Sequence, residues 1–131
     1  MRKMMSVVAV LFLASTAAMA DVGDISHEDL VKAIKEKKVV LIDVNGTEKY
    51  KKGHIPGAIN FETDGKDLAK KLPEDKNALI VAYCGSEKCS AYKAAAEAAQ
   101  KLGYTNVKHY KGGLAGWEKS GEKLEPAAET K

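Results

Sequence analysis

The stretch of residues 78–90 constrains the fold more than any other part of the sequence. It begins with an unbroken apolar run, residues 78–83, whose length suits a strand in a sheet that is covered on both faces. A loop that opens with Cys84 follows directly. Apolar residues then recur at helical spacing (Ala91, Ala95, Ala98 and Leu102). Gly103 follows as a typical helix-ending residue, so the stretch predicts a strand, a short loop and a helix.

This order of elements has a chemical consequence for Cys84. A thiol at the carboxyl end of a strand, beneath a helix N-terminus, faces unpaired backbone N–H groups and the positive end of the helix dipole. Both favour the thiolate over the thiol, and the thiolate is the nucleophilic form of cysteine. We therefore expect Cys84 to be a catalytic nucleophile. The alternative is a small apolar side chain that only packs in the loop.

Strand and helix patterns alternate along the rest of the chain. Strands are predicted at residues 39–44, 58–61, 78–83 and 107–110, and helices at residues 26–37, 47–52, 64–72 and 91–102, with a short closing helix from Leu114. Such alternation indicates an α/β fold, in which helices flank both faces of a central, mostly parallel sheet. Residues from about 121 onward have the composition of a frayed tail.

The first twenty residues have the pattern of a signal peptide. Arg2 and Lys3 precede an apolar segment, residues 4–13, and small residues at 18–20 resemble a cleavage site. We expect residues 1–20 to be removed, leaving one domain, residues 21–131, that is periplasmic or secreted without stable membrane insertion. Removal lowers the formal charge of +3 by two units, so nothing indicates a nucleic-acid partner.

Both cysteines of the chain, Cys84 and Cys89, lie in the central loop. In an oxidising compartment such a pair tends to form a disulfide. A bridge that closes so short a loop restrains the unfolded chain only weakly, so a chemical role is favoured over a stabilising one. Two cysteines five positions apart with scattered histidines do not make a zinc pattern, and no cofactor motif is present.

Several motifs together resemble the single-domain rhodanese-like proteins. They are Asp43-Val44, the segment 53–60 (Gly-His-Ile-Pro-Gly-Ala-Ile-Asn), Tyr83-Cys84, Gly112-Gly113 and Trp117, in order and at family-like spacing over residues 25–120. The resemblance implies a rhodanese fold and sulfurtransferase chemistry. In that family the loop cysteine takes a sulfane sulfur from thiosulfate or a related donor and passes it, as a persulfide, to a thiol or to cyanide.

The loop residues are the expected substrate-binding groups. The backbone N–H groups of residues 85–90 can form an anion-binding nest around Cys84, which assigns binding roles to Gly85, Ser86, Glu87, Lys88 and Ser90. Asp43, at the end of the neighbouring strand, either shapes the site or caps its own loop. The loop has the six-position length of rhodaneses, which argues against phosphate-ester hydrolysis.

Three positions depart from the family pattern. Glu87 stands where such loops carry glycine, and Cys89 and Asn45 stand where arginine is usual. Because Arg2 is the sole arginine, the mature chain lacks bidentate recognition of an oxyanion. We therefore expect thiosulfate to be a poor donor.

Three functions remain open at this point. The first is a sulfurtransferase that forms a persulfide on Cys84, using a small sulfur donor such as thiosulfate, polysulfide or persulfide and a thiol acceptor. In the second, Cys89 is a resolving thiol, and the pair acts as a dithiol oxidoreductase or persulfide reductase. The third is a catalytically idle rhodanese-like module that binds a protein or a sulfur compound.

Overall fold

The computed structural model describes residues 22–127, so the expected signal peptide lies outside the described residues. The strands are β1 (Gly23–Asp24), β2 (Val39–Asp43), β3 (Ile59–Asn60), β4 (Leu79–Tyr83) and β5 (Val107–Tyr110). The helices are α1 (His27–Lys35), α2 (Thr47–Lys52), α3 (Phe61–Asp64), α4 (Leu68–Lys71), α5 (Tyr92–Lys101) and α6 (Gly113–Lys119). Among these helices, none is long and apolar enough to cross a membrane.

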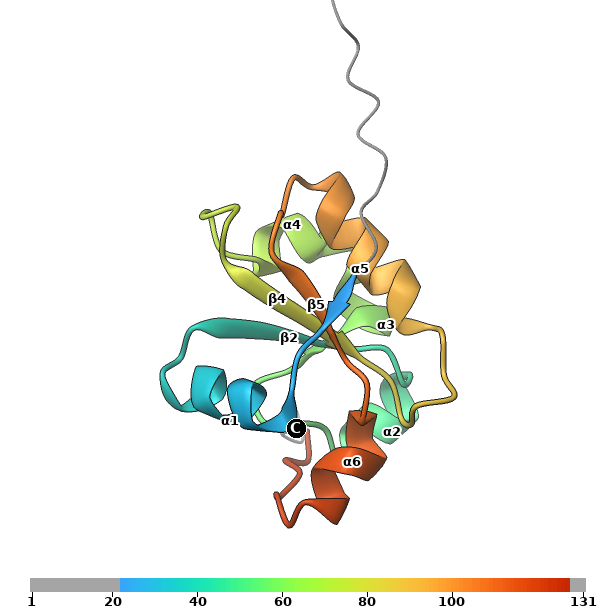
Figure 1. The fold of residues 1–131 in the computed structure, drawn as a ribbon. Helices are drawn as coiled ribbons and strands as arrows, with labels where there is room; N and C mark the ends of the chain where they lie inside the picture. Colours follow the sequence, from blue (N-terminus) through green and yellow to red (C-terminus); the bar gives the residue numbers. More distant parts are fainter. Residues whose placement is uncertain (1–21, 128–131) are drawn as a thin grey trace, which may run out of the picture.

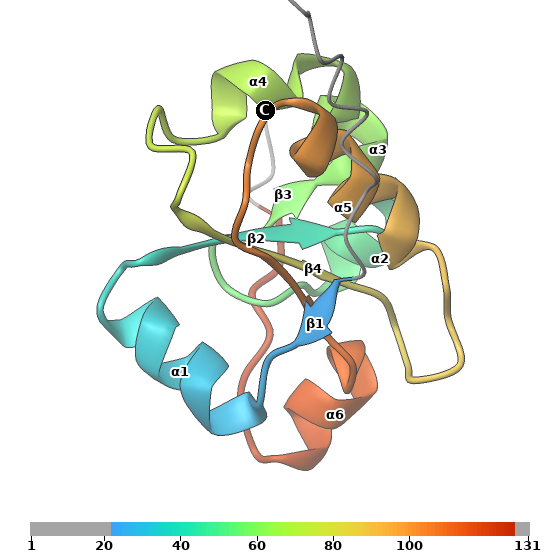
Figure 2. The same cartoon turned by 45° about the horizontal axis from the view of Figure 1, so that its top comes forward.

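The five strands form one sheet in the order β1-β5-β4-β2-β3, and each neighbouring pair is parallel (Figures 1 and 2). The central strand β4 pairs with β2 on one side, where Asp43 lies opposite Tyr83, and with β5 on the other. Ile80, Val81, Ala82 and Tyr83 are buried, as expected for an apolar run covered on both faces. The predicted α/β fold with a parallel sheet is confirmed.

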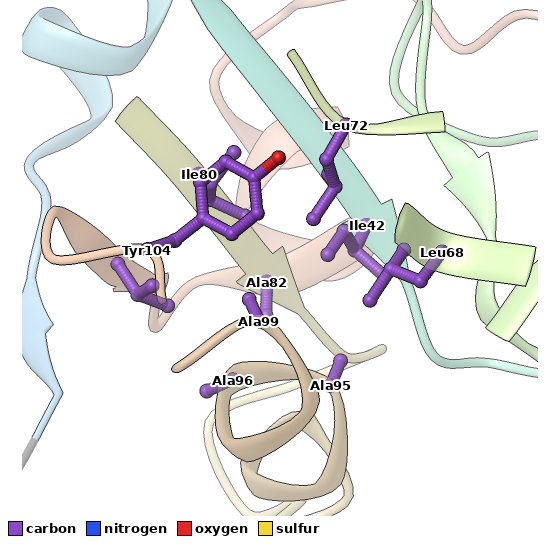
Figure 3. Packing of buried hydrophobic residues seen from close by; sticks show 10 residues of the cluster. Ile42, Leu68, Leu72, Ile80, Ala82, Ala95, Ala96, Ala99 and Tyr104 are labelled. Carbon is purple, nitrogen blue, oxygen red and sulfur yellow. The ribbon is translucent and has the colours of Figure 1, made fainter. Parts of the chain in front are cut away.

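Helices cover both faces of the sheet. On one face, three small alanines of α5 lie against Ala82 of β4, beside Leu68 of α4 and Leu72, which follows α4 (Figure 3; Ala95, Ala96 and Ala99). On the other face, α1 and α6 pack through Leu30 and Trp117 against Leu41, Val81 and Tyr83. Alanine side chains let α5 approach β4 closely, which places the start of the helix over the end of the strand.

The segment after β3 differs from its prediction. In place of one helix over residues 64–72, the chain makes α3, a 3-10 turn (Gly65–Asp67) and α4. The Asn60 side chain accepts a hydrogen bond from the Glu62 N–H group, so helix formation starts at Phe61, inside the strand expected at residues 58–61. Gly65 then lies against the Phe61 ring, where the helix changes to the 3-10 turn.

The expectation of a frayed tail from residue 121 is wrong for residues 121–127. The Trp117 indole donates to the carbonyl of Lys123 (3.0 Å), and His54 and Glu125 exchange two backbone hydrogen bonds in an antiparallel bridge. The Leu124 side chain packs on Gly53 and joins the apolar cluster beneath α1 and α6. This segment is therefore part of the fold, and its polar composition concealed the packing of Leu124.

Candidate active site

Cys84 lies directly after β4 at the carboxyl end of the central strand, and its side chain is 1% exposed. The start of α6 holds the backbone carbonyls of Cys84 and of the residue that follows it. The Leu114 N–H group donates to the Cys84 carbonyl, and the Ala115 N–H group donates to the Gly85 carbonyl, both at 3.0 Å. The backbone that carries the thiol is thus fixed by a helix from the C-terminal part of the domain.

Two backbone N–H groups point at the Cys84 sulfur. Tyr92, the first residue of α5, donates its N–H group to Sγ at 3.2 Å, and the N–H group of Ala91 also bonds to the sulfur and lowers the pKa of the thiol. Ala91 is the N-cap residue of α5 and has no side chain that could accept a hydrogen bond. The sulfur therefore lies where a capping side-chain oxygen would otherwise be.

Burial opposes this effect of the helix. The pKa of the Cys84 thiol is raised above its ordinary value, chiefly because burial disfavours the charged sulfur and secondly because the Cys89 side chain hydrogen-bonds to it. The expected stabilisation of the thiolate by N–H groups is present, but burial and Cys89 outweigh it in this structure, and the nucleophilic role of Cys84 stays a prediction. The thiol keeps its proton at neutral pH, and ionisation has to accompany the reaction with a donor.

Cys89 is half-buried, and the structure brings its side chain against Cys84. Its own N–H group donates to the Ser86 carbonyl at 3.3 Å, which turns the loop back toward the first cysteine. Both cysteines are free thiols. The contact needed for a resolving thiol is present, while that role itself stays a prediction.

The expected nest differs from the observed one. The N–H groups that reach the sulfur belong to Ala91 and Tyr92, at the start of the helix, and not to residues 85–90. The Ser86, Glu87, Lys88 and Ser90 side chains are exposed on the loop, and the Gly85 carbonyl is held by α6. The polar side chains of the loop therefore face solvent, and their substrate-binding roles stay predictions.

Asp43 is completely buried, and both of its carboxylate oxygens are used inside the protein. Oδ1 accepts from the Asn45 N–H group at 2.7 Å, and Oδ2 accepts from the Tyr83 hydroxyl at 2.7 Å. The capping interpretation that the sequence left open is thus the one observed. A substrate-binding role for Asp43 stays a prediction, and the complete burial of its carboxylate does not favour direct contact with a ligand.

Residues 26–120 match the family model described as the rhodanese-like domain. The chain belongs to the rhodanese-like family.

Individual relatives cover this rhodanese-like domain to different extents. The HTH-type transcriptional regulator Rv0324 of Mycobacterium tuberculosis is 34% identical over 107 residues, which is 79% of this chain and 45% of that protein. The chain thus spans less than half of that relative. The BH2092 protein of Bacillus halodurans has a TM-score of 0.62 and 28% identity, covering 79% of this chain and 77% of that one.

The 3-mercaptopyruvate sulfotransferase SseA of Escherichia coli shares the fold of this rhodanese-like domain. Its TM-score is 0.65 at 22% sequence identity, and the match covers 83% of this chain and 52% of that one.

Two residues that the sequence singled out make contacts at this rhodanese-like site that the sequence did not predict. Gly113 has a φ of +60°, and a Cβ atom there would lie 2.4 Å from the Cys84 carbonyl oxygen. The Asn45 side chain lies beside Gly85, and its buried Nδ2 has no hydrogen-bond partner within residues 22–127. The Gly112-Gly113 pair signalled a turn, but only the folded chain shows what that turn touches.

The described part of this rhodanese-like domain contains no group of three or more His, Cys, Asp or Glu side chains that could hold a metal ion. It also contains no arginine, and the hydrogen bond that reaches the Cys84 sulfur from Tyr92 comes from a backbone N–H group.

Proposed function

We propose that this domain is a sulfurtransferase that forms a persulfide on Cys84 and passes the sulfane sulfur to a thiol or cyanide-type acceptor. The observation that carries the proposal is the Cys84 sulfur at the carboxyl end of β4, with N–H donors from Ala91 and Tyr92. The likeness of the fold to that of a 3-mercaptopyruvate sulfotransferase supports it.

The reaction runs in two displacements. The Cys84 thiol loses its proton to solvent, and the thiolate attacks the sulfane sulfur of a hydropersulfide or polysulfide donor. The donor S–S bond breaks, the donor's remaining part leaves as a thiolate, and Cys84 carries a persulfide. An acceptor thiolate then attacks the outer sulfur and releases the Cys84 thiolate, so the enzyme undergoes no net oxidation.

The N–H groups of Ala91 and Tyr92 offset the charge that develops on Cys84 in both displacements. Without a guanidinium group in the described residues, the site lacks the group that best matches a dianionic oxyanion. The exposed carboxylate side chain of Glu87 adds like charge on the same loop. We expect hydropersulfides and polysulfides to load Cys84 at least tenfold faster than thiosulfate.

A second candidate function follows from the contact between the two thiols. Once Cys84 carries a persulfide, the Cys89 thiolate attacks Cys84 Sγ, hydrosulfide leaves, and a Cys84–Cys89 disulfide forms. The sulfane sulfur is reduced to sulfide while the two cysteines are oxidised, and an external thiol must then reduce the disulfide. The hydrogen bond between the two side chains favours this persulfide reductase activity.

Intact mass of residues 21–131 decides between these functions. Wild type, Cys84→Ser and Cys89→Ser are measured after polysulfide, after thiosulfate and after reductant. A gain of one sulfur in wild type that reductant removes, and that is lost in Cys84→Ser, supports the transferase. Loss of two hydrogens in wild type, with added sulfur retained in Cys89→Ser, supports the reductase. No change with any donor contradicts both and leaves a binding module.

We also propose that the protein acts outside the cytoplasm, on the basis of the N-terminal pattern of Arg2, Lys3 and the apolar segment that follows. Fractionation of cells that express the full chain, with N-terminal sequencing of the product, tests the predicted cleavage after Ala20.

A further inference from the structure

His109 is a buried polar residue that the proposed chemistry leaves without a role. It lies on β5, directly beside Ala82 of β4, two residues before Cys84. The residue is only 5% exposed. Its Nδ1 lies 3.2 Å from Asp24 Oδ1 on the edge strand β1, and its Nε2 has no hydrogen-bond partner among residues 22–127.

The His109 ring stacks face to face on the ring of Tyr92. The ring centroids are 3.4 Å apart and the planes differ by 7°. Tyr92 is also the residue whose N–H group donates to Cys84 Sγ. Contacts thus run from the Asp24 carboxylate to the His109 ring, from that ring to the Tyr92 ring, and from the Tyr92 N–H group to the Cys84 sulfur. They connect β1, β5 and α5 with the end of β4.

The charge state of His109 follows from its surroundings. Burial lowers its pKa, Asp24 acts in the opposite direction, and the Lys111 ammonium lowers it further, with a net decrease. The ring is therefore neutral at pH 7. Because a carboxylate can only accept, Nδ1 carries the proton and donates it to Asp24, which fixes the orientation of the ring.

We propose that His109 is a positioning residue that holds Tyr92, and with it the N–H group on the Cys84 sulfur. Asp24 holds the imidazole ring parallel to the ring of Tyr92, and the stacking of the two rings holds the first turn of α5 above the thiol. A small rotation of Tyr92 would lengthen the N–H···S bond, which favours the charged form of the sulfur. A role of His109 in catalysis rests on the proposed function, whereas the positioning of Tyr92 by His109 does not depend on any sulfur donor.

The test measures the ionisation of Cys84 directly. In a Cys89→Ser background Cys84 is the sole thiol, and its rate of alkylation by iodoacetamide is followed across pH. We expect His109→Leu to raise the midpoint of this profile by about one pH unit. At a fixed pH below the midpoint, the thiolate fraction would then be about tenfold smaller. His109→Phe keeps a flat ring against Tyr92 and is expected to show less than half of that shift.

His27→Phe is the matched control. His27 also has aromatic neighbours, Tyr110 and Trp117, but it lies on α1 at the opposite face of the sheet, so its profile should coincide with that of the background. An unchanged midpoint in folded His109→Leu overturns the proposal. If that variant does not fold, Asp24→Ala decides, because the Asp24 side chain is 61% exposed. A rise in the midpoint that makes the thiolate fraction about threefold smaller supports the proposal. An unchanged midpoint contradicts it. If the midpoint shifts but no sulfur donor loads Cys84, the positioning by His109 stands and only the proposed function is contradicted.

Discussion

At the scale of a single residue, Gly113 determines how the loop that begins with Cys84 is held. Its φ of +60° belongs to the left-handed region, and its missing side chain allows the Cys84 carbonyl oxygen to approach. The close approach lets the next residue, Leu114, donate its N–H group to that same carbonyl. A glycine far along the chain thus fixes the backbone of Cys84.

We expect Gly113→Ala to lower the free energy of unfolding by about 2–4 kcal/mol, because the new methyl group clashes with the Cys84 carbonyl and the backbone angle is unfavourable for alanine. Urea denaturation measures the loss. Alkylation of Cys84 should also become faster, because the displaced loop exposes the thiol.

Gly121→Ala is the control for Gly113→Ala. Gly121 has a φ of +84°, but no atom lies within 4 Å of the position of its Cβ. Only the backbone cost remains, about 1 kcal/mol. Equal losses in the two variants would show that the contact with Cys84 carries no energy.

The placement of Cys84 after a buried strand could be predicted from the sequence, because a buried strand, a loop and a helix follow one another within one stretch. Gly113 and His109 could not be assigned to the site in the same way. Their importance depends on close approaches to residues far away in the chain, Cys84 and Tyr92, and local sequence patterns carry no information on such approaches.

At the scale of the elements, Tyr83 connects three parts of the fold: β4, β2 and the turn before β3. Its hydroxyl, at the end of β4, donates to Asp43 Oδ2 at the end of β2 and accepts from the N–H group of Ile55 in the turn before β3. Burial and the Asp43 carboxylate raise the pKa of Tyr83, so the hydroxyl stays protonated as the donor. The carboxyl edge of the sheet is thereby fixed next to Cys84.

Tyr83→Phe removes the donor of a buried carboxylate and the acceptor of a buried N–H group. We expect the free energy of unfolding to fall by about 3 kcal/mol, measured by urea denaturation. Tyr104→Phe serves for comparison, because the Tyr104 hydroxyl donates only to the neutral carbonyl of Pro73, and about 1 kcal/mol is expected. A smaller loss for Tyr83→Phe than for Tyr104→Phe would contradict this account.

The elements themselves were largely predictable. The apolar runs of β2 and β4 and the Ser26 cap of α1, whose hydroxyl accepts from the Asp29 N–H group, follow local rules. The helix expected over residues 64–72 was not, because the Asn60 cap competes with the apolar pattern and starts a helix earlier.

For the molecule as a whole, the segment after α6 completes the domain. Glu125 pairs with His54 by hydrogen bonds of 2.8 and 3.0 Å, and its carboxylate accepts from the Gly57 N–H group at 3.2 Å. Between these contacts and α6, Leu124 covers Gly53. The last described residues therefore hold the turn that leads to β3.

Leu124→Ala is expected to lower the free energy of unfolding by about 1–2 kcal/mol, less than for a fully buried leucine because this side chain is half-buried. Thermal or urea unfolding measures the change. Lys123→Ala is the control, since the exposed Lys123 contributes its backbone carbonyl to Trp117, which alanine retains. A frayed segment would show no difference between the two variants.

The pairing of the first strand with the last has a consequence for the order of events during synthesis. Asp24 on β1 meets His109 on β5 across a sequence separation of 85 residues, and the exchange between His54 and Glu125 closes later still in the chain. A nascent chain that still lacks β5 carries an unpaired edge on β4, and β1 has no neighbour to join. Such topology makes folding slow and confines it to the complete polypeptide. The surroundings of Cys84 are therefore assembled only after the ribosome has released almost the whole domain.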